Sequence, residues 1–129
     1  MEFTMNEHGF QSEFDFGTLN VSSNENFGFR PYALLVSSVA VCSGLTLRKI
    51  LEKMRIPFTD LKITADVKRN EKEANRVEEI ALKFIITGTN IPERKVEKAL
   101  ALTKKNCSMV QSVKDSIRIM ETYEINEKG

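Results

Sequence analysis

The sequence predicts a small α+β domain, and two patterns support this prediction. Segments at the start, middle and end of the chain alternate apolar and polar residues, as strands with one buried face do. Two other segments repeat apolar residues at helical spacing. The chain has 129 residues, which is the length of one domain. We therefore expect residues 1–129 to form a single domain with the element order βββ-α-ββ-α-β.

The N-terminal third predicts a three-stranded meander. Its apolar residues alternate with polar ones through Met1, Phe3 and Met5, then Phe10, Phe14 and Phe16, and then Leu19 and Val21. Glycine-containing turns at residues 7–9 and 17–18 separate the strands.

A long helix is expected between Pro31, which suits the first turn of a helix, and Pro57, which ends it. Its first half has almost no polar face, which predicts burial on all sides. After Gly44 a charged face appears, so the helix is expected to emerge toward solvent. One small sheet cannot cover such a helix, so we predict a homodimer. A single mixed sheet wrapped around the helix is the less economical alternative.

The second half predicts a hairpin, a helix and a last strand. Residues 61–67 and 80–86 alternate cleanly on either side of a charged turn at 69–76. A helix is then expected with Asn90 as N-cap, Pro92 in its first turn and Glu93 at the third position. The run Lys104-Lys105-Asn106 predicts a break in this helix just before Cys107. The last strand is expected to follow the alternation of Ile117, Ile119, Tyr123 and Ile125.

Composition excludes several classes of function. The net charge is +1, from 19 basic and 18 acidic residues, which argues against nucleic-acid binding. Residues 1–17 lack the features of a signal peptide, and the apolar run 32–47 is too short and too polar to span a membrane. We therefore expect a cytoplasmic protein. His8, the one histidine, is expected to be a solvated turn residue, and too few cysteines and histidines are present for a zinc site.

Cys42 and Cys107 are the residues with most scope for chemistry. Ser38 and Thr46, one helical turn to either side of Cys42, form with it a polar stripe on an otherwise apolar helix. Both cysteines could instead be small core residues. A reactive thiol requires a stabilised thiolate. Arg30 is the local cation that could stabilise Cys42, or it is a solvated loop arginine.

The segment around Cys42 resembles the OsmC/Ohr family. The matching residues run through Arg30-Pro31-Tyr32-Ala33-Leu34-Leu35, then Ser37-Ser38-Val39-Ala40-Val41-Cys42, and then Leu45-Thr46-Leu47-Arg48-Lys49-Ile50-Leu51. Cys107 with Val110 resembles the family's second cysteine segment. The resemblance covers residues 10–125 and is most specific around Cys42.

This resemblance implies an intertwined homodimer with sites at its interface, and thiol-dependent reduction of organic hydroperoxides. Cys42 would be the peroxidatic cysteine, Cys107 would resolve its sulfenic acid to a disulfide, and an external dithiol would restore both thiols. No metal, flavin or haem is required. An apolar pocket that includes Phe27 and Phe29 would favour alkyl peroxides.

Two departures from the family leave alternatives open. Its peroxidase members use an arginine from the N-terminal strands, and a glutamate soon after the helix-opening proline holds that arginine. Here no arginine precedes Arg30, and Tyr32 stands at the place of the glutamate. The alternatives are a non-catalytic dimer that binds a small apolar ligand and a redox sensor oxidised at Cys42.

Overall fold

The computed structural model describes residues 1–128, which fold into two compact units. The first unit is Met1–Ser37 and the second begins at Ser38. Helix α1 (Pro31–Lys53) contributes residues to both. The two units are described in turn, and the expectation of a single domain stays a prediction.

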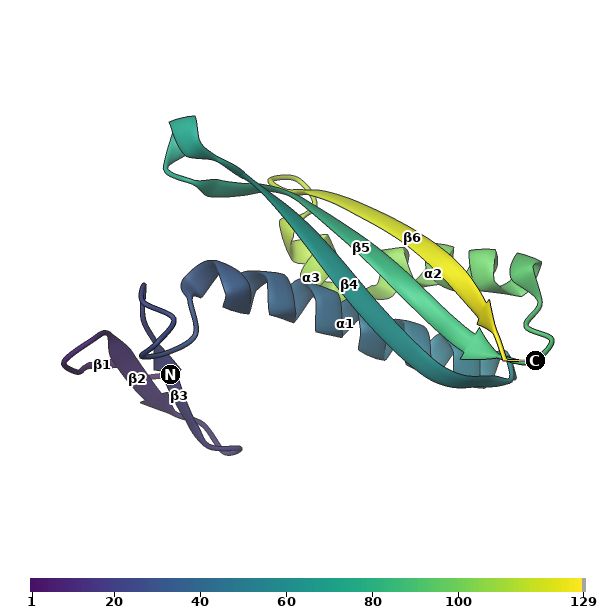
Figure 1. Cartoon of the computed structure of the whole chain (residues 1–129), viewed down its shortest axis with the longest axis horizontal. Coiled ribbons are helices and arrows are strands. Elements are labelled where there is room, and N and C mark those ends of the chain that lie inside the picture. The colour runs from purple at the N-terminus through teal and green to yellow at the C-terminus, as the bar shows by residue number, and fades with distance from the viewer. Residues whose placement is uncertain (129) are drawn as a thin grey trace. The chain divides into compact units, whose positions relative to one another are not determined.

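The first unit holds a three-stranded antiparallel sheet, which confirms the predicted meander (Figure 1). Its strands, in the order β1-β2-β3, are β1 (Thr4–Met5), β2 (Phe10–Glu13) and β3 (Thr18–Val21). The second strand is shorter than predicted. The backbones of Phe14 and Gly17 exchange hydrogen bonds of 2.9 and 3.0 Å, which close a tight turn. Phe14 and Phe16 therefore belong to this turn and not to a strand.

The apolar side chains of the first unit are largely exposed. This holds for Met5, Phe3, Phe10, Phe14, Phe16, Phe27 and Phe29. A sheet is stabilised mainly by the apolar surface that it removes from water, and three short strands are marginal without such burial. The single chain therefore leaves this sheet without a core of its own.

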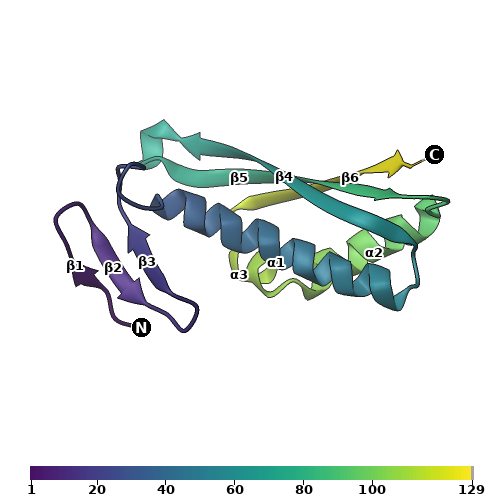
Figure 2. The same ribbon diagram turned by 60° about the horizontal axis from the view of Figure 1, so that its bottom comes forward.

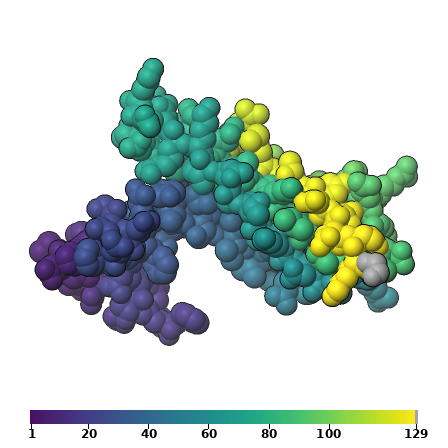
Figure 3. Space-filling view, viewed as in Figure 1, coloured from purple at the N-terminus to yellow at the C-terminus, as the bar shows by residue number. Residues whose placement is uncertain are grey.

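The second unit is built on a three-stranded mixed sheet. Its strands, in the order β4-β5-β6, are β4 (Phe58–Asn70), β5 (Arg76–Gly88) and β6 (Arg118–Glu127). β4 and β5 form the predicted hairpin around the 3-10 turn η1 (Glu71–Glu73), and β6 pairs parallel to β5. All three strands are longer than the alternation predicted. The tip of the hairpin projects from the unit (Figure 3).

The core of this unit lies between one face of the sheet and the helices. α1 and the later helices lie on the same side of the sheet (Figure 2). Alternate residues of β5 point to this side and are at most 1% exposed, and they are Ile80, Leu82, Phe84 and Ile86. From α1, Val39, Leu47 and Leu51 are fully buried. The buried face that the alternation predicted for β5 is confirmed, and it lies on the side of the sheet that the helices cover.

Helix α1 begins at Pro31 as predicted, but it is not buried on all sides in the single chain. Val41 and Leu45 are 53% and 56% exposed. The reason is that the sheet covers only one side of this helix. By length and composition α1 could also cross a bilayer. A buried core helix passes the same test, so the predicted absence of a membrane partner stays a prediction.

The segment between β5 and β6 forms two helices, α2 (Glu93–Asn106) and α3 (Ser108–Val113). The break falls at Cys107, where the sequence predicted it. The predicted start of α2 is wrong. Asn90 has a left-handed backbone, with φ of 56°, and its N–H donates to the Glu127 carboxylate at 2.6 Å. Asn90 therefore forms a turn, and Pro92 is the N-cap.

Leu47→Ala should lower the free energy of unfolding by about 2–5 kcal/mol. The Leu47 side chain has no exposed surface, so its truncation leaves a cavity in the core. Leu102→Ala is the matched control on α2, since Leu102 is 44% exposed. Urea denaturation followed by circular dichroism measures both changes. Equal losses in the two variants would contradict the assigned core.

Candidate functional site

The two cysteines meet in the second unit. Cys42 lies in α1 and is partly exposed, whereas Cys107 lies between α2 and α3 and is 0% exposed. Both are free thiols, and the Cys107 thiol donates a hydrogen bond to the Cys42 sulfur. Residues far apart in the sequence are thus placed for reaction with one another.

The break between α2 and α3 places Cys107 at this point. Cys107 has extended backbone, with φ of −76° and ψ of 113°. Two carbonyls in the last turns of α2 accept hydrogen bonds from side chains. The Asn106 amide donates to the Leu102 carbonyl at 2.8 Å, and the Gln111 amide donates to the Lys104 carbonyl at 3.0 Å. These hydrogen bonds supply donors to backbone carbonyls near the end of α2, and α3 begins directly after Cys107.

The start of α3 stabilises the thiolate of Cys42. Burial alone would raise the pKa of Cys42, but hydrogen bonds to the sulfur outweigh it and lower that pKa below the usual range. They come from the Met109 backbone, the Ser108 hydroxyl at 3.6 Å, the Cys107 thiol and the Ser108 backbone. The first N–H groups of a helix have no partner within it, so they are free to donate to an anion. Cys42 is thus the more acidic thiol.

Cys107 has the opposite character. Burial raises the pKa of the Cys107 thiol, and the neighbouring Cys42 raises it further, against hydrogen bonds from Ser43 and the Val110 backbone. The Ser43 hydroxyl lies 3.4 Å from the Cys107 sulfur. The arrangement therefore makes Cys42 the more readily ionised thiol and favours the protonated form of Cys107. This division suits a nucleophile and a second thiol that reacts later.

Arg30, the predicted activating cation, belongs to the first unit. Its guanidinium lies over the Tyr32 ring, 5.0 Å from the ring centroid, which is a cation–π contact. Tyr32 therefore holds Arg30 at the place where the family resemblance led us to expect a glutamate. The stabilisation of Cys42 by Arg30 stays a prediction. The groups that donate to the Cys42 sulfur in the second unit belong to Ser108, Met109 and Cys107 and are uncharged. The sequence had instead led us to expect a cation.

The aromatic residues of the first unit lie near its turns. His8 is an exposed turn residue, as predicted, and its ring also stacks on Phe27 with centroids 3.6 Å apart. Phe27 and Phe29 are about half exposed. Their contribution to a substrate pocket stays a prediction.

Sequence reasoning missed three polar residues of the site, Ser43, Ser108 and Glu121. Within the predicted polar stripe, the Thr46 hydroxyl donates to the Cys42 carbonyl at 2.9 Å. Ser43 lies between the Cys107 sulfur and the Glu121 carboxylate. Two signals could have found these residues. Ser43 is a further polar residue, beside Ser38 and Thr46, in a largely apolar helical segment, and Glu121 interrupts the apolar alternation of the last strand.

Metal-binding residues do not gather in the part of the chain that the structure describes. Within residues 1–128, no three histidine, cysteine, aspartate or glutamate side chains are grouped so that they could hold a metal ion.

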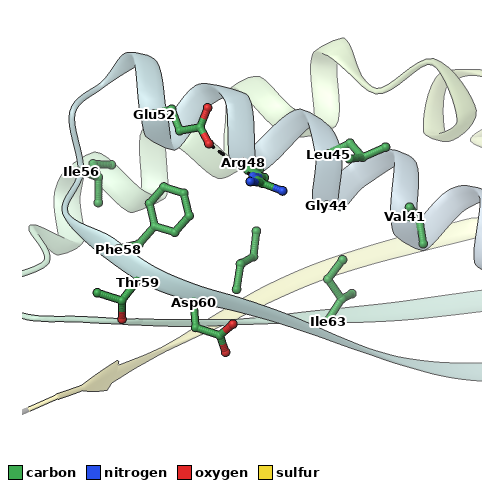
Figure 4. A pocket seen from close by; sticks show the side chains of 11 residues that line it. Val41, Gly44, Leu45, Arg48, Glu52, Ile56, Phe58, Thr59, Asp60 and Ile63 are labelled. Carbon is green, nitrogen blue, oxygen red and sulfur yellow. Dashed lines mark hydrogen bonds and ion pairs between the residues drawn. The ribbon is translucent and has the colours of Figure 1, made fainter.

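A groove of about 720 Å³ runs between α1 and β4 (Figure 4). Val41, Gly44 and Leu45 of α1 line one side, and apolar residues of β4 line the other. Gly44 permits the close approach, because a Cβ atom there would collide with the end of the Ile63 side chain. An ion pair of 3.3 Å between Arg48 and Glu52 borders the groove. The groove leaves apolar surface of the second unit open.

Comparison with known proteins identifies the family. A sequence model described as OsmC-like protein matches residues 22–122, which is most of the chain. The chain belongs to the OsmC-like protein family. The shared region spans α1, both cysteines and the strands that support them, so the resemblance seen in the sequence is confirmed.

Individual OsmC-like relatives are distant. Protein YhfA of Escherichia coli K12 is 26% identical over 96 residues, which cover 74% of this chain and 72% of YhfA. A crystal structure of a hypothetical protein from Aquifex aeolicus is 28% identical with a TM-score of 0.87, over 99% of this chain and 96% of that one.

The organic hydroperoxide resistance protein of Elizabethkingia anophelis is 18% identical with a TM-score of 0.71, over 97% and 94% of the two chains. These likenesses establish an α+β OsmC-like fold.

Ser108 offers a direct test of how Cys42 is activated. In a Cys107→Ser background, Ser108→Ala should raise the pKa of Cys42 because it removes the hydroxyl donor. Ser108→Pro should raise that pKa further, because it also removes the backbone N–H. Proline suits the first position of α3, and Cys107 already has the extended backbone that a following proline requires.

The pH dependence of iodoacetamide alkylation, followed by intact mass, gives the pKa of Cys42 in each variant. Circular dichroism controls for the integrity of the fold. An unchanged pKa in both variants would show that the start of α3 does not stabilise the thiolate.

Proposed function

We propose that this OsmC-like protein is a thiol-dependent peroxidase that reduces organic hydroperoxides in defence against oxidative stress. The observation that carries the proposal is the contact between a more acidic, partly exposed Cys42 and a less acidic, buried Cys107. Membership of the OsmC-like family supports it, as does the fold shared with a protein named for organic hydroperoxide resistance.

The proposed reaction begins at Cys42. Its thiolate attacks the terminal oxygen of the hydroperoxide, the O–O bond breaks, and the departing alkoxide takes a proton from water to become an alcohol. Cys42 is left as a sulfenic acid. The sulfur of Cys107 then attacks the Cys42 sulfur, the S–O bond breaks, and water leaves as the disulfide forms. An external dithiol returns both cysteines to thiols by disulfide exchange. The proposal requires no cofactor.

A redox sensor oxidised at Cys42 is the second candidate. The same pair of thiols would serve a sensor, because oxidation needs the same activated thiolate. The departure at Tyr32 from the family's glutamate favours this reading, since a slower peroxide reaction suffices for signalling. A sensor differs from a peroxidase in that it does not consume peroxide continuously when a dithiol is supplied.

Steady-state consumption of cumene hydroperoxide in the presence of a dithiol should separate these functions. The wild-type protein should consume peroxide over many turnovers, and Cys42→Ser should abolish consumption, because it removes the nucleophile. Cys107→Ser should still react once, since Cys42 remains. Residual peroxide and intact mass are the measurements. A single turnover in the wild type would support the sensor, and thiols that do not react at neutral pH would contradict both functions.

We also propose that two copies of this chain form a homodimer through the exposed side of α1. The apolar side chains of Val41 and Leu45 support this, as does the groove beside them. The phenylalanines of the first unit, which lack a core in the single chain, support it too. Large apolar patches of this kind are typical of interfaces.

Leu45→Glu should convert the dimer to monomers, because it places a charge on this apolar surface. Size-exclusion chromatography with light scattering measures the mass in solution. Leu102→Glu is the control, since it adds the same charge at an exposed leucine of α2. A monomeric wild-type protein, or an unchanged mass in Leu45→Glu, would contradict the proposed interface.

A further inference from the structure

The half-buried carboxylate of Glu121 lies among apolar side chains on the inner face of the sheet. In the parallel pairing of β5 with β6, Glu121 stands opposite Leu82, which is 1% exposed. The neighbouring pairs in this row are Ile80 with Ile119 and Phe84 with Tyr123. An apolar residue would suit this position, because burial of a carboxylate is costly unless it is paired. The position therefore calls for a specific reason for glutamate.

Ser43 links this carboxylate to Cys107. The Ser43 hydroxyl lies 3.5 Å from Oε1 of Glu121 and 3.4 Å from the Cys107 sulfur, and Ser43 is fully buried. A hydroxyl has one proton, so it can donate to only one of these neighbours at a time.

Because Ser43 has one hydroxyl proton, the hydrogen bonds that join Cys107, Ser43 and Glu121 can be oriented in two ways. When Glu121 is ionised it can only accept, so Ser43 donates to Glu121 and the Cys107 thiol can donate to the Ser43 oxygen. When Glu121 is protonated it donates to Ser43, and Ser43 donates to a Cys107 thiolate. Shifting two protons along the same hydrogen bonds converts one arrangement into the other. The geometry is thus that of a proton relay.

We propose that Ser43 and Glu121 form a proton relay that deprotonates Cys107 when the disulfide closes and reprotonates it when the disulfide is reduced. This inference rests on the proposed function, and it assigns that reaction two further residues. Ser43 contacts the reacting sulfur. Glu121 acts through Ser43 and is a positioning residue that holds the proton.

Because Cys107 is buried, it requires a neighbouring group that can accept its proton, and the relay provides one. Cys107 is 0% exposed, so water cannot reach its proton directly. In the reduced protein this proton points to the Cys42 sulfur. Oxidation of Cys42 to a sulfenic acid removes the negative charge that attracts the proton. The thiol then turns to Ser43, which is its other polar neighbour on α1.

Protons and electrons balance in each direction. During closure the Cys107 proton passes to the Ser43 oxygen, and the Ser43 proton passes to Glu121. The Cys107 sulfur forms the S–S bond, and the hydroxide leaving Cys42 takes a proton from solvent. During reduction one thiolate of the external dithiol attacks the Cys42 sulfur and displaces Cys107, and the second thiolate then displaces Cys42, so the dithiol supplies two electrons and leaves as a disulfide. The departing Cys107 thiolate then takes the Ser43 proton while Glu121 restores the hydroxyl.

The surroundings of Glu121 suit this exchange. Burial raises the pKa of Glu121, while Lys104 of α2 and the Ser43 hydroxyl act in the opposite direction. A carboxyl group whose pKa moves toward neutrality exchanges protons more readily under working conditions. Lys104 is the charged group that acts on Glu121, and Ser43 connects Glu121 to the Cys107 thiol.

The test follows disulfide closure as a function of pH in Glu121→Gln, which keeps the shape of the side chain but cannot hold the proton. One equivalent of cumene hydroperoxide is mixed with reduced protein. Dimedone traps the sulfenic acid at Cys42, and intact mass follows closure. In the wild type, closure should slow as pH falls through the ionisation of Glu121. In the variant, closure at pH 7 should be ~100-fold slower, and its pH midpoint should move up to the ionisation of Cys107.

Ser43→Ala should give the same shift, since it interrupts the relay in the middle. Glu124→Gln is the control on the same strand, where Glu124 pairs with Lys83 at 3.1 Å, and its profile should match the wild type. Sulfenic acid formation at Cys42 should be unchanged in Glu124→Gln, and it is measured separately in every variant so that closure is timed from the same intermediate. If Glu121→Gln closes more slowly with an unchanged pH midpoint, Glu121 has a merely structural role and the relay is overturned. An unchanged rate of closure in Glu121→Gln would also overturn the relay.

A second oxidant separates failure of the relay from failure of the proposed function. Diamide converts one thiolate to an adduct that the second thiol displaces, so closure again requires Cys107 to lose its proton. If peroxide does not oxidise wild-type Cys42, the proposed function fails, and the diamide profiles still decide the relay. If peroxide oxidises Cys42 but Glu121→Gln closes with the wild-type profile, the relay alone fails.

Discussion

Cys107 has extended backbone between two helices, and the chemistry of the site depends on this short interruption. Within a continuous helix, the N–H groups of Ser108 and Met109 would bond to carbonyls one turn earlier. The break frees them for the Cys42 sulfur and brings the Cys107 thiol to the same place. Side-chain amides of Asn106 and Gln111 compensate the carbonyls at the end of α2. These two hydrogen bonds help to stabilise the break.

The same arrangement gives the two thiols different exposure and acidity. Cys42 is partly exposed and receives several uncharged donors, whereas Cys107 is buried beside Ser43. In a thiol pair of this kind, the more acidic and accessible member reacts first with an oxidant. Neutral donors can stabilise a thiolate because they lie close to it and are already oriented by the backbone. This offers a route to an activated cysteine that differs from the pairing with an arginine expected from the family.

Much of the fold could be predicted, because its determinants are local. The alternation of the strands and the prolines at either end of α1 are visible in the sequence, and so is the break before Cys107. The start of α2 was misplaced because the pattern at Asn90 is that of an N-cap, whereas Glu127 draws the Asn90 backbone into a turn. The roles of Ser43 and Glu121 could not be predicted, since they depend on which face of β6 meets α1. Exposure of Val41 was not expected, because sequence patterns do not show which surfaces a single chain leaves uncovered.

The central claim is that Cys42 and Cys107 of one chain form a reacting pair. Peptide mapping by tandem mass spectrometry, after one equivalent of cumene hydroperoxide and alkylation of the remaining thiols, tests this most directly. The account predicts a disulfide between Cys42 and Cys107, and mixing isotopically labelled with unlabelled protein should show that it joins cysteines of the same chain. Sulfinic acid at Cys42 beside an alkylated Cys107, or a disulfide between chains, would contradict it.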